Sequence, residues 1–442
     1  MKFFLILCIA FFTCRFYASE SYQGLQKKIE LLEAQLKLLK EEVQRQRDDS
    51  MHDAKVDLKP GLKVISPNKR HNFSVGGRVM FDVHNISPDN SLSSALGLSG
   101  KDGVQFRRTR MFIKGTLNKK LHYQWQYDFS RAGIGQTKAT YIKYKANDGH
   151  SIWAGNIKEP FGLEEVNSSK HETFMEESAA TLAFTPNYNP GFLYRKEDPI
   201  DDFGWELGVF RTDEGSFGRS PNTTGSNLGD WNYTGRLTYI TNYNLRKSKV
   251  LHLGLAYSYR NLNGDNIRFD SKVENIYHNV SLVDTGLIAA QSAKQFGYEV
   301  AWVNGSLSLQ SELFNIRVDP AGEQSNADFG GHYVMMSYFL TGESRPYNRT
   351  YRYFGRVKPR TSYFLGGRGA WELTARYSAV ELNDFDTGIF GGEADSATLG
   401  LNWYMDSRTR LMLNWINTEV ISGAGVNLGN TESISMRFQV DF

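Results

Sequence analysis

From residue 72 to the C-terminus, apolar and polar side chains alternate with a period of two. In LHYQWQYDF (residues 121–129), every second residue is leucine or aromatic, and the residues between them are His, Gln, Gln and Asp. LHLGLAYSYR (251–260) and WNYTGRLTY (231–239) repeat this alternation. A period of two indicates β-strands with one apolar face, and about ten residues is the length that a tilted membrane strand needs. The pattern therefore predicts transmembrane β-strands.

Sixteen segments of this kind lie between residues 72 and 442. An even number of strands closes a barrel with both termini on the same side of the membrane. We therefore predict an all-β fold, a 16-stranded antiparallel transmembrane β-barrel over 72–442. Long connections then fall on the outer side, and 159–189 is the third outer loop. The connection 343–368 is also long but falls on the side of the short turns, so either it folds there or the strand count is wrong by two.

The last strand supports a location in the bacterial outer membrane. Its apolar residues share one face and end on the terminal aromatic residue: Ile434, Met436, Phe438, Val440 and Phe442. A chain that ends in an aromatic residue on an apolar strand face resembles the assembly signal of outer-membrane barrels. The lipid bilayer of the outer membrane is therefore the first partner that we expect.

The first nineteen residues are typical of a signal peptide. Lys2 precedes an apolar run over 3–12, and the small residues Ala18 and Ser19 offer a cleavage site. The run is too short to span a bilayer as a helix. Both cysteines of the chain, Cys8 and Cys14, lie in this leader. The mature chain would thus have no disulfide, no thiolate metal site and no cysteine nucleophile.

Residues 20–47 are expected to form an α-helical coiled coil in the periplasm, followed by a linker over 48–71. The apolar residues of its seam are spaced alternately by four and three positions: Leu25, Ile29, Leu32, Leu36, Leu39 and Val43. A lone helix of this length is marginal in water, so it needs a partner. We favour an oligomerising helix; the alternative is a helix that packs on its own barrel.

The composition favours a channel over other classes of protein. The 51 Lys and Arg against 48 Asp and Glu leave no strong basic excess, so nucleic acid is not expected as a partner. The nine histidines are scattered, and neither a His-Glu-x-x-His metal motif nor a Gly-x-Ser-x-Gly nucleophile elbow occurs. We expect no enzymatic activity, no catalytic residue, no metal site and no cofactor.

A barrel of sixteen strands is wide enough for an aqueous channel, and rings of charge set selectivity in such channels. In FRRTRMFIK (106–114), the alternation turns Arg108, Arg110 and Lys114 inward if Met111 and Ile113 face lipid. These cations could line the pore. Alternatively, they could pair with inward carboxylates and only neutralise the charges of the barrel wall.

The segment KEPFGLEEVNSSKHETFMEES (158–178) carries six glutamates against two lysines. It lies in the third outer loop, which at about thirty residues is too long to be only a connector. If the loop folds into the barrel, its acidic residues face the basic wall: Glu164, Glu165, Glu172, Glu176 and Glu177. Opposed charges across a narrow gap would create a transverse field. The alternative is that these glutamates anchor the loop to wall arginines, and both roles can hold for different residues.

Several stretches resemble the phosphate- and polyphosphate-selective porin O/P family. They include DGVQFRRTRMFIKGTL (102–117), AGNIKEPFGLEEVNSSKHETFMEES (154–178), SYFLTGESRPY (337–347) and GAWELTARYS (369–378). Together they follow the family order over most of 72–442. The resemblance implies a trimeric sixteen-stranded porin whose third loop folds inward. In phosphate-binding members, serines and a lysine of that loop hold the anion, and Ser168, Ser169 and Lys170 match them.

The sequence departs from the phosphate-selective members at Glu165 and Glu177, where those members carry a lysine and an arginine. A unit charge at about 4 Å interacts by roughly 4 kcal/mol at an effective dielectric of 20, which is enough to remove or invert a preference. We expect a porin for passive diffusion of small hydrophilic solutes and ions, phosphate and other anions among the candidates, with weak or cation-leaning selectivity. The alternative is a structural or adhesive barrel tethered through its coiled coil.

Overall fold

The computed structural model describes residue 24 and residues 26–45, 54–58, 61–130, 136–211, 223–224, 231–245, 248–323 and 325–442. The predicted signal peptide and the seam residue Leu25 lie outside these residues. Residues 26–45 are helical, and two short strands follow, β1 (Lys55–Asp57) and β2 (Leu62–Ile65). Among the described residues, no helix is both long enough and apolar enough to cross a membrane.

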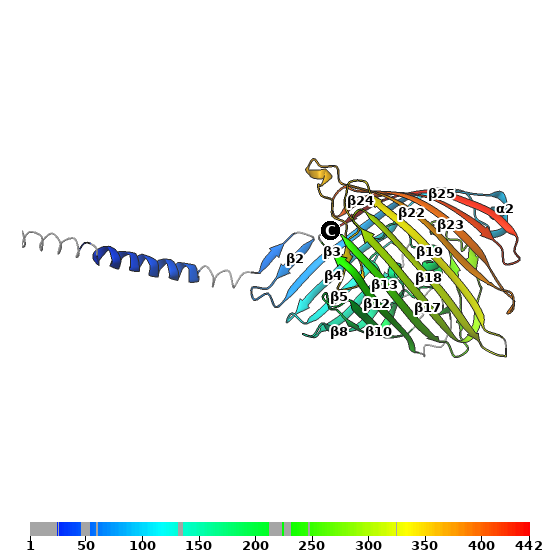
Figure 1. Ribbon diagram of the computed structural model, residues 1–442, viewed down its shortest axis with the longest axis horizontal. Helices are drawn as coiled ribbons and strands as arrows, with labels where there is room; N and C mark the ends of the chain where they lie inside the picture. The colour runs from blue at the N-terminus through cyan, green and yellow to red at the C-terminus, as the bar shows by residue number, and fades with distance from the viewer. Residues whose placement is uncertain are drawn as a thin grey trace, which may run out of the picture. The chain divides into compact units, whose positions relative to one another are not determined.

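The described residues contain sixteen long strands that form a closed antiparallel barrel (Figure 1). They are β3 (Asn72–Pro88), β4 (Lys101–Leu117), β5 (Leu121–Asp128), β7 (Thr140–Lys145), β8 (His150–Lys158), β9 (Tyr188–Lys196), β10 (Phe203–Arg211), β12 (Trp231–Asn244), β13 (Lys249–Asn261), β17 (Ile288–Asn304), β18 (Leu307–Pro320), β19 (Ala327–Phe339), β22 (Ala370–Asp384), β23 (Ile389–Tyr404), β24 (Thr409–Ile421) and β25 (Asn427–Asp441). The last strand, β25, pairs with the first, β3, and places Arg437 opposite Asp82. The predicted fold class is thereby confirmed for the barrel.

The barrel wall alternates as the sequence predicts, with apolar side chains outside and polar side chains inside. On β12, Tyr233 and Leu237 are 51% and 58% exposed, whereas Thr234 and Arg236 between them are buried. The outward residues meet lipid in a membrane, and the inward ones meet water or other polar groups. The same alternation on β25 exposes Ile434, Met436 and Phe438.

Shorter elements lie in the connections between the barrel strands. They are α2 (Asn90–Leu96), β6 (Gln136–Thr137), α3 (Leu163–Val166), α4 (Ala179–Phe184), β11 (Thr223–Thr224), β14 (Asn266–Ile267), β15 (Asp270–Ser271), β16 (Val283–Asp284), β20 (Tyr347–Asn348), β21 (Tyr353–Phe354) and a 3-10 helix (Tyr363–Leu365). The connection between β8 and β9, residues 159–187, is called loop 3 below. It contains α3 and α4 and supplies much of the packing inside the barrel.

An apolar cluster fixes loop 3 within the barrel. Phe184 of α4 packs against Phe314 of β18 and against Phe269, with ring centroids 6.5 and 5.7 Å apart. Phe161, near the start of loop 3, stacks on the same Phe314 at 5.9 Å. Phe161, Phe184 and Phe314 are fully buried, so the loop is held by a small hydrophobic core as well as by its charges.

The long connection 343–368 folds at the end of the barrel that carries the short turns. Its two short strands pair as a hairpin, with Tyr347 opposite Phe354 and Asn348 opposite Tyr353. The backbone N–H of Phe354 donates to the side chain of Asn167 in loop 3, at 2.9 Å. The connection therefore reaches the lumen from the side opposite to loop 3, and a strand count of sixteen needs no revision.

The described seam residues of the helix over 26–45 are exposed. Ile29, Leu32, Leu36, Leu39 and Val43 are each between 47% and 64% exposed. The structure shows a helix here, and a coiled coil stays a prediction.

Candidate functional site

Loop 3 begins at a carboxylate that is fully enclosed by the barrel wall. Glu159 accepts two hydrogen bonds from the guanidinium of Arg260 on β13, both at 2.8 Å. Asn189 and Thr234 donate to the same carboxylate at 2.7 and 2.5 Å. The side chain of Glu159 has no exposed surface. A buried charge needs such a full set of partners, so this residue fixes where the loop leaves the wall.

The short helix α3 is fixed between two strands on the far side of the lumen. Glu312 of β18 accepts the backbone N–H groups of Leu163 and Glu164 at 2.6 and 2.7 Å. The Glu164 side chain turns to the wall, where it pairs with Arg376 of β22 at 2.9 Å and accepts from Thr181 at 2.7 Å. Glu164 was predicted to line the constriction, and its contacts are those of an anchor.

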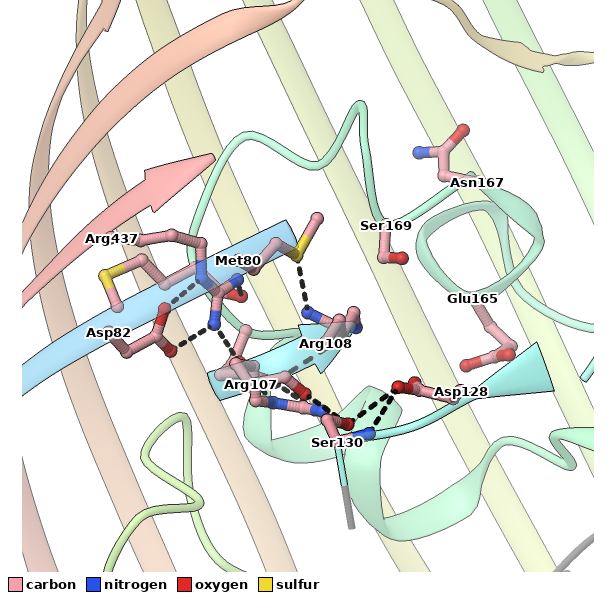
Figure 2. Close-up of polar contacts among 12 residues, drawn as sticks. Met80, Asp82, Arg107, Arg108, Asp128, Ser130, Glu165, Asn167, Ser169 and Arg437 are labelled. Atoms are coloured by element: carbon pink, nitrogen blue, oxygen red, sulfur yellow. Dashed lines mark hydrogen bonds and ion pairs between the residues drawn. The ribbon is translucent and has the colours of Figure 1, made fainter. Parts of the chain in front are cut away.

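The end of loop 3 is held by three arginines. Glu176 accepts two hydrogen bonds from Arg107 at 2.9 and 2.8 Å, pairs with Arg437 at 2.6 Å and lies 3.8 Å from Arg108. Figure 2 shows Arg107, Arg108 and Arg437 together, with Arg437 also bound to Asp82. Burial alone raises the pKa of Glu176, but the three guanidinium groups outweigh it and hold the pKa below its usual range.

Arg107 is a lumen-facing residue that strict alternation misses. Phe106 and Met111 are both exposed on the outer face, although they are five positions apart and a strict period of two would place them on opposite faces. The outward parity therefore shifts by one residue between them, and both Arg107 and Arg108 face the lumen. The signal in the sequence is the change of apolar parity from Val104 and Phe106 to Met111. Such a shift is typical of a β-bulge beside a functional site.

The two predicted arginines of β4 have different surroundings. Arg110 is paired with Asp128 of β5 at 2.6 Å, and Ser130 donates to the same carboxylate at 2.7 Å. Arg108 makes its closest polar contacts with the sulfur of Met80 at 3.7 Å and with Glu176. Arg110 is thus largely neutralised by the wall, whereas Arg108 shares one carboxylate with two other cations and leaves net positive charge at this point.

The two glutamates that distinguish this sequence lie together beside a lysine. Glu165 is 3.0 Å from the Nζ of Lys158 on β8, and it exchanges a hydrogen bond with Glu177. Burial raises the pKa of Glu177 well above its usual range, and the charges of Glu165 and Glu172 raise it further. Burial also raises the pKa of Glu165, against the opposing effect of Lys158. A hydrogen bond between two carboxyls needs a proton on one of them, so we expect the pair to carry about one negative charge.

The serines of loop 3 and the following lysine lie close to Arg78 of β3. Arg78 of β3 donates to the hydroxyl of Ser169 at 2.5 Å. Burial and the charge of Arg78 lower the pKa of the neighbouring Lys170 to about 7. Ser168 and Ser169 thus offer hydroxyl groups next to two cations, which is the chemistry that binds an oxyanion.

Loop 3 separates two hollows in the lumen. The outer hollow, about 470 Å³, is lined by loop 3, by β4 and by residues of the 262–287 connection such as Asp270 and Tyr277. The inner hollow, about 270 Å³, is lined by loop 3 and by Tyr351 and Tyr353 of the 343–368 connection. Lys158, Ser169 and Tyr188 line both. Loop 3 thus contributes to the lining of both hollows.

The predicted site residues divide between these hollows. Arg108, Arg110, Glu165 and Glu177 line the outer hollow, and Ser169 lines both. Lys114, Ser168 and Lys170 line the inner hollow. In the part of the chain that the structure describes, no group of three His, Asp or Glu side chains is arranged to hold a metal ion.

With this geometry established, comparisons with known proteins identify the family. The family profile described as phosphate-selective porin O and P matches residues 73–442. This chain belongs to that family. It is an outer-membrane porin, and its barrel encloses a water-filled channel for passive diffusion of small hydrophilic solutes and ions. The resemblance noted in the sequence is thereby confirmed, and both the family and the fold are those of a channel.

Individual relatives agree with this assignment. Porin O of Pseudomonas aeruginosa is 25% identical over 403 residues, which cover 83% of this chain and 87% of the relative. Two solved structures share the fold. One is an anion-selective porin from Comamonas acidovorans, with a TM-score of 0.52, 13% identity, and coverage of 84% of this chain and 100% of the other. The other is the outer-membrane protein OmpT of Vibrio cholerae in its trimer form, with a TM-score of 0.51, 11% identity, and coverage of 84% and 99%.

Proposed function

We propose that this porin passes small anions, phosphate among them, in preference to cations. The observation that carries the proposal is the charge of the inner hollow, where five basic residues face one acidic residue. That acidic residue, Glu206, is already paired with Arg195 and Arg236, at 3.3 and 3.2 Å. A confined positive potential raises the local concentration of anions and lowers that of cations.

Three of the five cations face the lumen without a carboxylate beside them. Within the described residues, no carboxylate lies at ion-pair distance from Arg78, Lys114 or Lys170. The hydroxyls of Ser168 and Ser169 add hydrogen bonds that an oxyanion accepts. This arrangement agrees with the name of the family and with the description of the Comamonas porin as anion-selective.

The charge reversals at Glu165 and Glu177 led us to expect weak or cation-leaning selectivity from the sequence alone. Two features favour anion selectivity instead. Lys158 lies 3.0 Å from Glu165 and offsets one charge, and the raised pKa of Glu177 removes much of the second. The carboxyls line the outer hollow, whereas the excess of cations lies in the inner hollow.

The test is the reversal potential of the reconstituted porin across a tenfold KCl gradient. We expect a reversal potential of the sign for chloride preference, and inhibition of the chloride current by added phosphate. The double variant Lys114→Gln/Lys170→Gln should lose most of this preference. Lys101→Gln, which removes an exposed charge at the start of β4, is the matched control. A potential of the cation sign contradicts the proposal, and a folded barrel that never conducts favours the adhesive alternative.

We also propose that three copies assemble, with the 26–45 helices packed along their apolar seams in the periplasm. The support is the exposed seam, the marginal stability of a lone helix and the trimer form of the Vibrio outer-membrane protein. Crosslinking of the native protein in membranes tests the trimer, and crosslinks between cysteines placed at position 36 test the helix packing. A monomer in both assays contradicts this proposal.

A further inference from the structure

The inner hollow carries a second kind of lining that its charges do not explain. Six aromatic side chains face it, from four barrel strands or their ends and from the 343–368 connection: Phe112, Tyr141, Trp153, Tyr188, Tyr351 and Tyr353. The inside of a porin is ordinarily polar, because it is in contact with water. Aromatic surface in a channel thus needs a reason beyond the wall itself.

Three cations of the inner hollow lie close to its aromatic rings. Arg195 lies 5.8 Å from the ring centre of Trp153 and 5.3 Å from that of Tyr351. Lys114 and Lys170 lie 5.0 and 5.8 Å from the ring of Phe112. Each of these three cations is therefore next to a flat apolar surface. A solute that enters meets a positive charge and an aromatic face at the same time.

The two tyrosines of the 343–368 connection are held in place from outside the hollow. Arg352, which lies between them in sequence, donates to the backbone carbonyls of Asp201, Asp198 and Phe203 at 2.6, 3.3 and 3.2 Å. Tyr351 and Tyr353 lie with ring centres 5.7 Å apart and planes 11° apart. Rings fixed in this way lose little freedom when a ligand stacks on them, which favours binding.

We propose that the inner hollow binds small organic anions that carry a planar apolar ring, with an aromatic carboxylate as the simplest case. The carboxylate would lie among Arg78, Lys170 and the Ser169 hydroxyl, and the ring would lie against the aromatic side chains. The volume of about 270 Å³ lies just below the usual range for ligand pockets, which suits a small solute with one ring. This inference rests on the proposed anion preference and adds a substrate class to it.

The test compares how three anions of the same charge block the chloride current of single channels. Benzoate has an aromatic ring, cyclohexanecarboxylate has an aliphatic ring and acetate has none. We expect benzoate to block at a concentration about fivefold lower than the other two, the size of an aromatic contact of about 1 kcal/mol. Tyr351→Leu should remove this difference, and Tyr351→Phe should keep it.

Tyr353→Leu provides a second variant of the hollow, and Tyr363→Leu is the matched control. Tyr363 belongs to the same connection but lies outside both hollows and is 49% exposed. Chloride conductance shows that each variant is folded. Equal block by the three anions in a channel that is still anion-selective overturns this inference and leaves the proposed function intact. Persistence of the benzoate preference in both Tyr351→Leu and Tyr353→Leu also overturns it, whereas a cation-selective channel overturns the proposed function itself.

Discussion

The paired carboxyls of Glu165 and Glu177 should behave as one charge rather than two. In Glu165→Gln, Glu177 loses the neighbouring charge that raises its pKa, so its pKa falls and it ionises in place of Glu165. In Glu177→Gln, Glu165 keeps the charge and its pairing with Lys158. Each single variant should therefore leave the charge of the constriction at pH 7 almost unchanged. The double variant removes that charge.

The size of the effect follows from the distances. An anion that passes about 4 Å from an unscreened unit charge is repelled by roughly 4 kcal/mol at an effective dielectric of 20. Lys158, at 3.0 Å from Glu165, opposes this repulsion in the native porin. Removal of the shared charge leaves Lys158 unopposed, and salt in the pore screens part of the gain. We expect the anion-to-cation permeability ratio to rise about tenfold in the double variant, which corresponds to about 1.4 kcal/mol, and less than about twofold in either single variant.

The measurement is the reversal potential across a KCl gradient at pH 7 for the native porin, both single variants and the double variant. Asp386→Asn, which removes an exposed carboxylate in the turn between β22 and β23, is the control for a general loss of negative charge. The reasoning is refuted if the two single effects add up to the double effect. It is also refuted if Glu165→Gln alone produces the tenfold change.

The strands were accessible to sequence analysis because lipid outside and water inside impose a period of two on every wall segment. WNYTGRLTY (231–239) shows this period, and its residues alternate in burial as predicted. The place of loop 3 was accessible for a similar reason. A long acidic segment beside a basic wall has favourable contacts only if it folds inward.

The ion-pair partners of individual loop 3 residues could not be predicted from the sequence. Contacts across the lumen join residues that are far apart in sequence, and no periodic pattern marks them. Glu159 and Arg260 are separated by 101 positions, and Glu164 and Arg376 by 212. Sequence reasoning placed Glu164 in the constriction because it could not distinguish an anchoring carboxylate from a pore-lining one. The tyrosines of 343–368 were missed because the direction in which a long turn folds leaves no signal in its own pattern.

Three further predictions follow from the anchors and the charges. Because the pKa of Lys170 is about 7, its charge is present at pH 6 and mostly lost at pH 8, so anion preference should fall over this range. Reversal potentials measured across the same range should show a weaker fall in Lys170→Gln. Lys170→Arg should keep its anion preference at pH 8. Glu159→Gln leaves Arg260 buried without its charge partner and should lower the free energy of unfolding by about 3–5 kcal/mol. We expect a lower thermal unfolding temperature and, as loop 3 loosens, a larger and noisier conductance. Unchanged values contradict the anchoring role. Deletion of residues 21–47 should leave single-channel conductance unchanged while weakening the trimer on native gels; loss of conductance in a folded barrel is the contrary result.

We expect that the acidic loop does not make the channel cation-selective, because most of its carboxylates already form ion pairs with residues of the barrel wall. Glu159, Glu164 and Glu176 each form an ion pair with a strand arginine, and Glu165 pairs with Lys158. Each such pair adds almost no net field at the scale of a passing ion. The selectivity of the pore is then set by the charges that the loop does not reach, and in the inner hollow these charges are predominantly cations. A charge reversal in sequence thus changes selectivity only where the structure leaves the new charge without a partner. In loop 3, Glu165 pairs with Lys158 and Glu177 shares a hydrogen bond with Glu165, so neither reversal meets that condition.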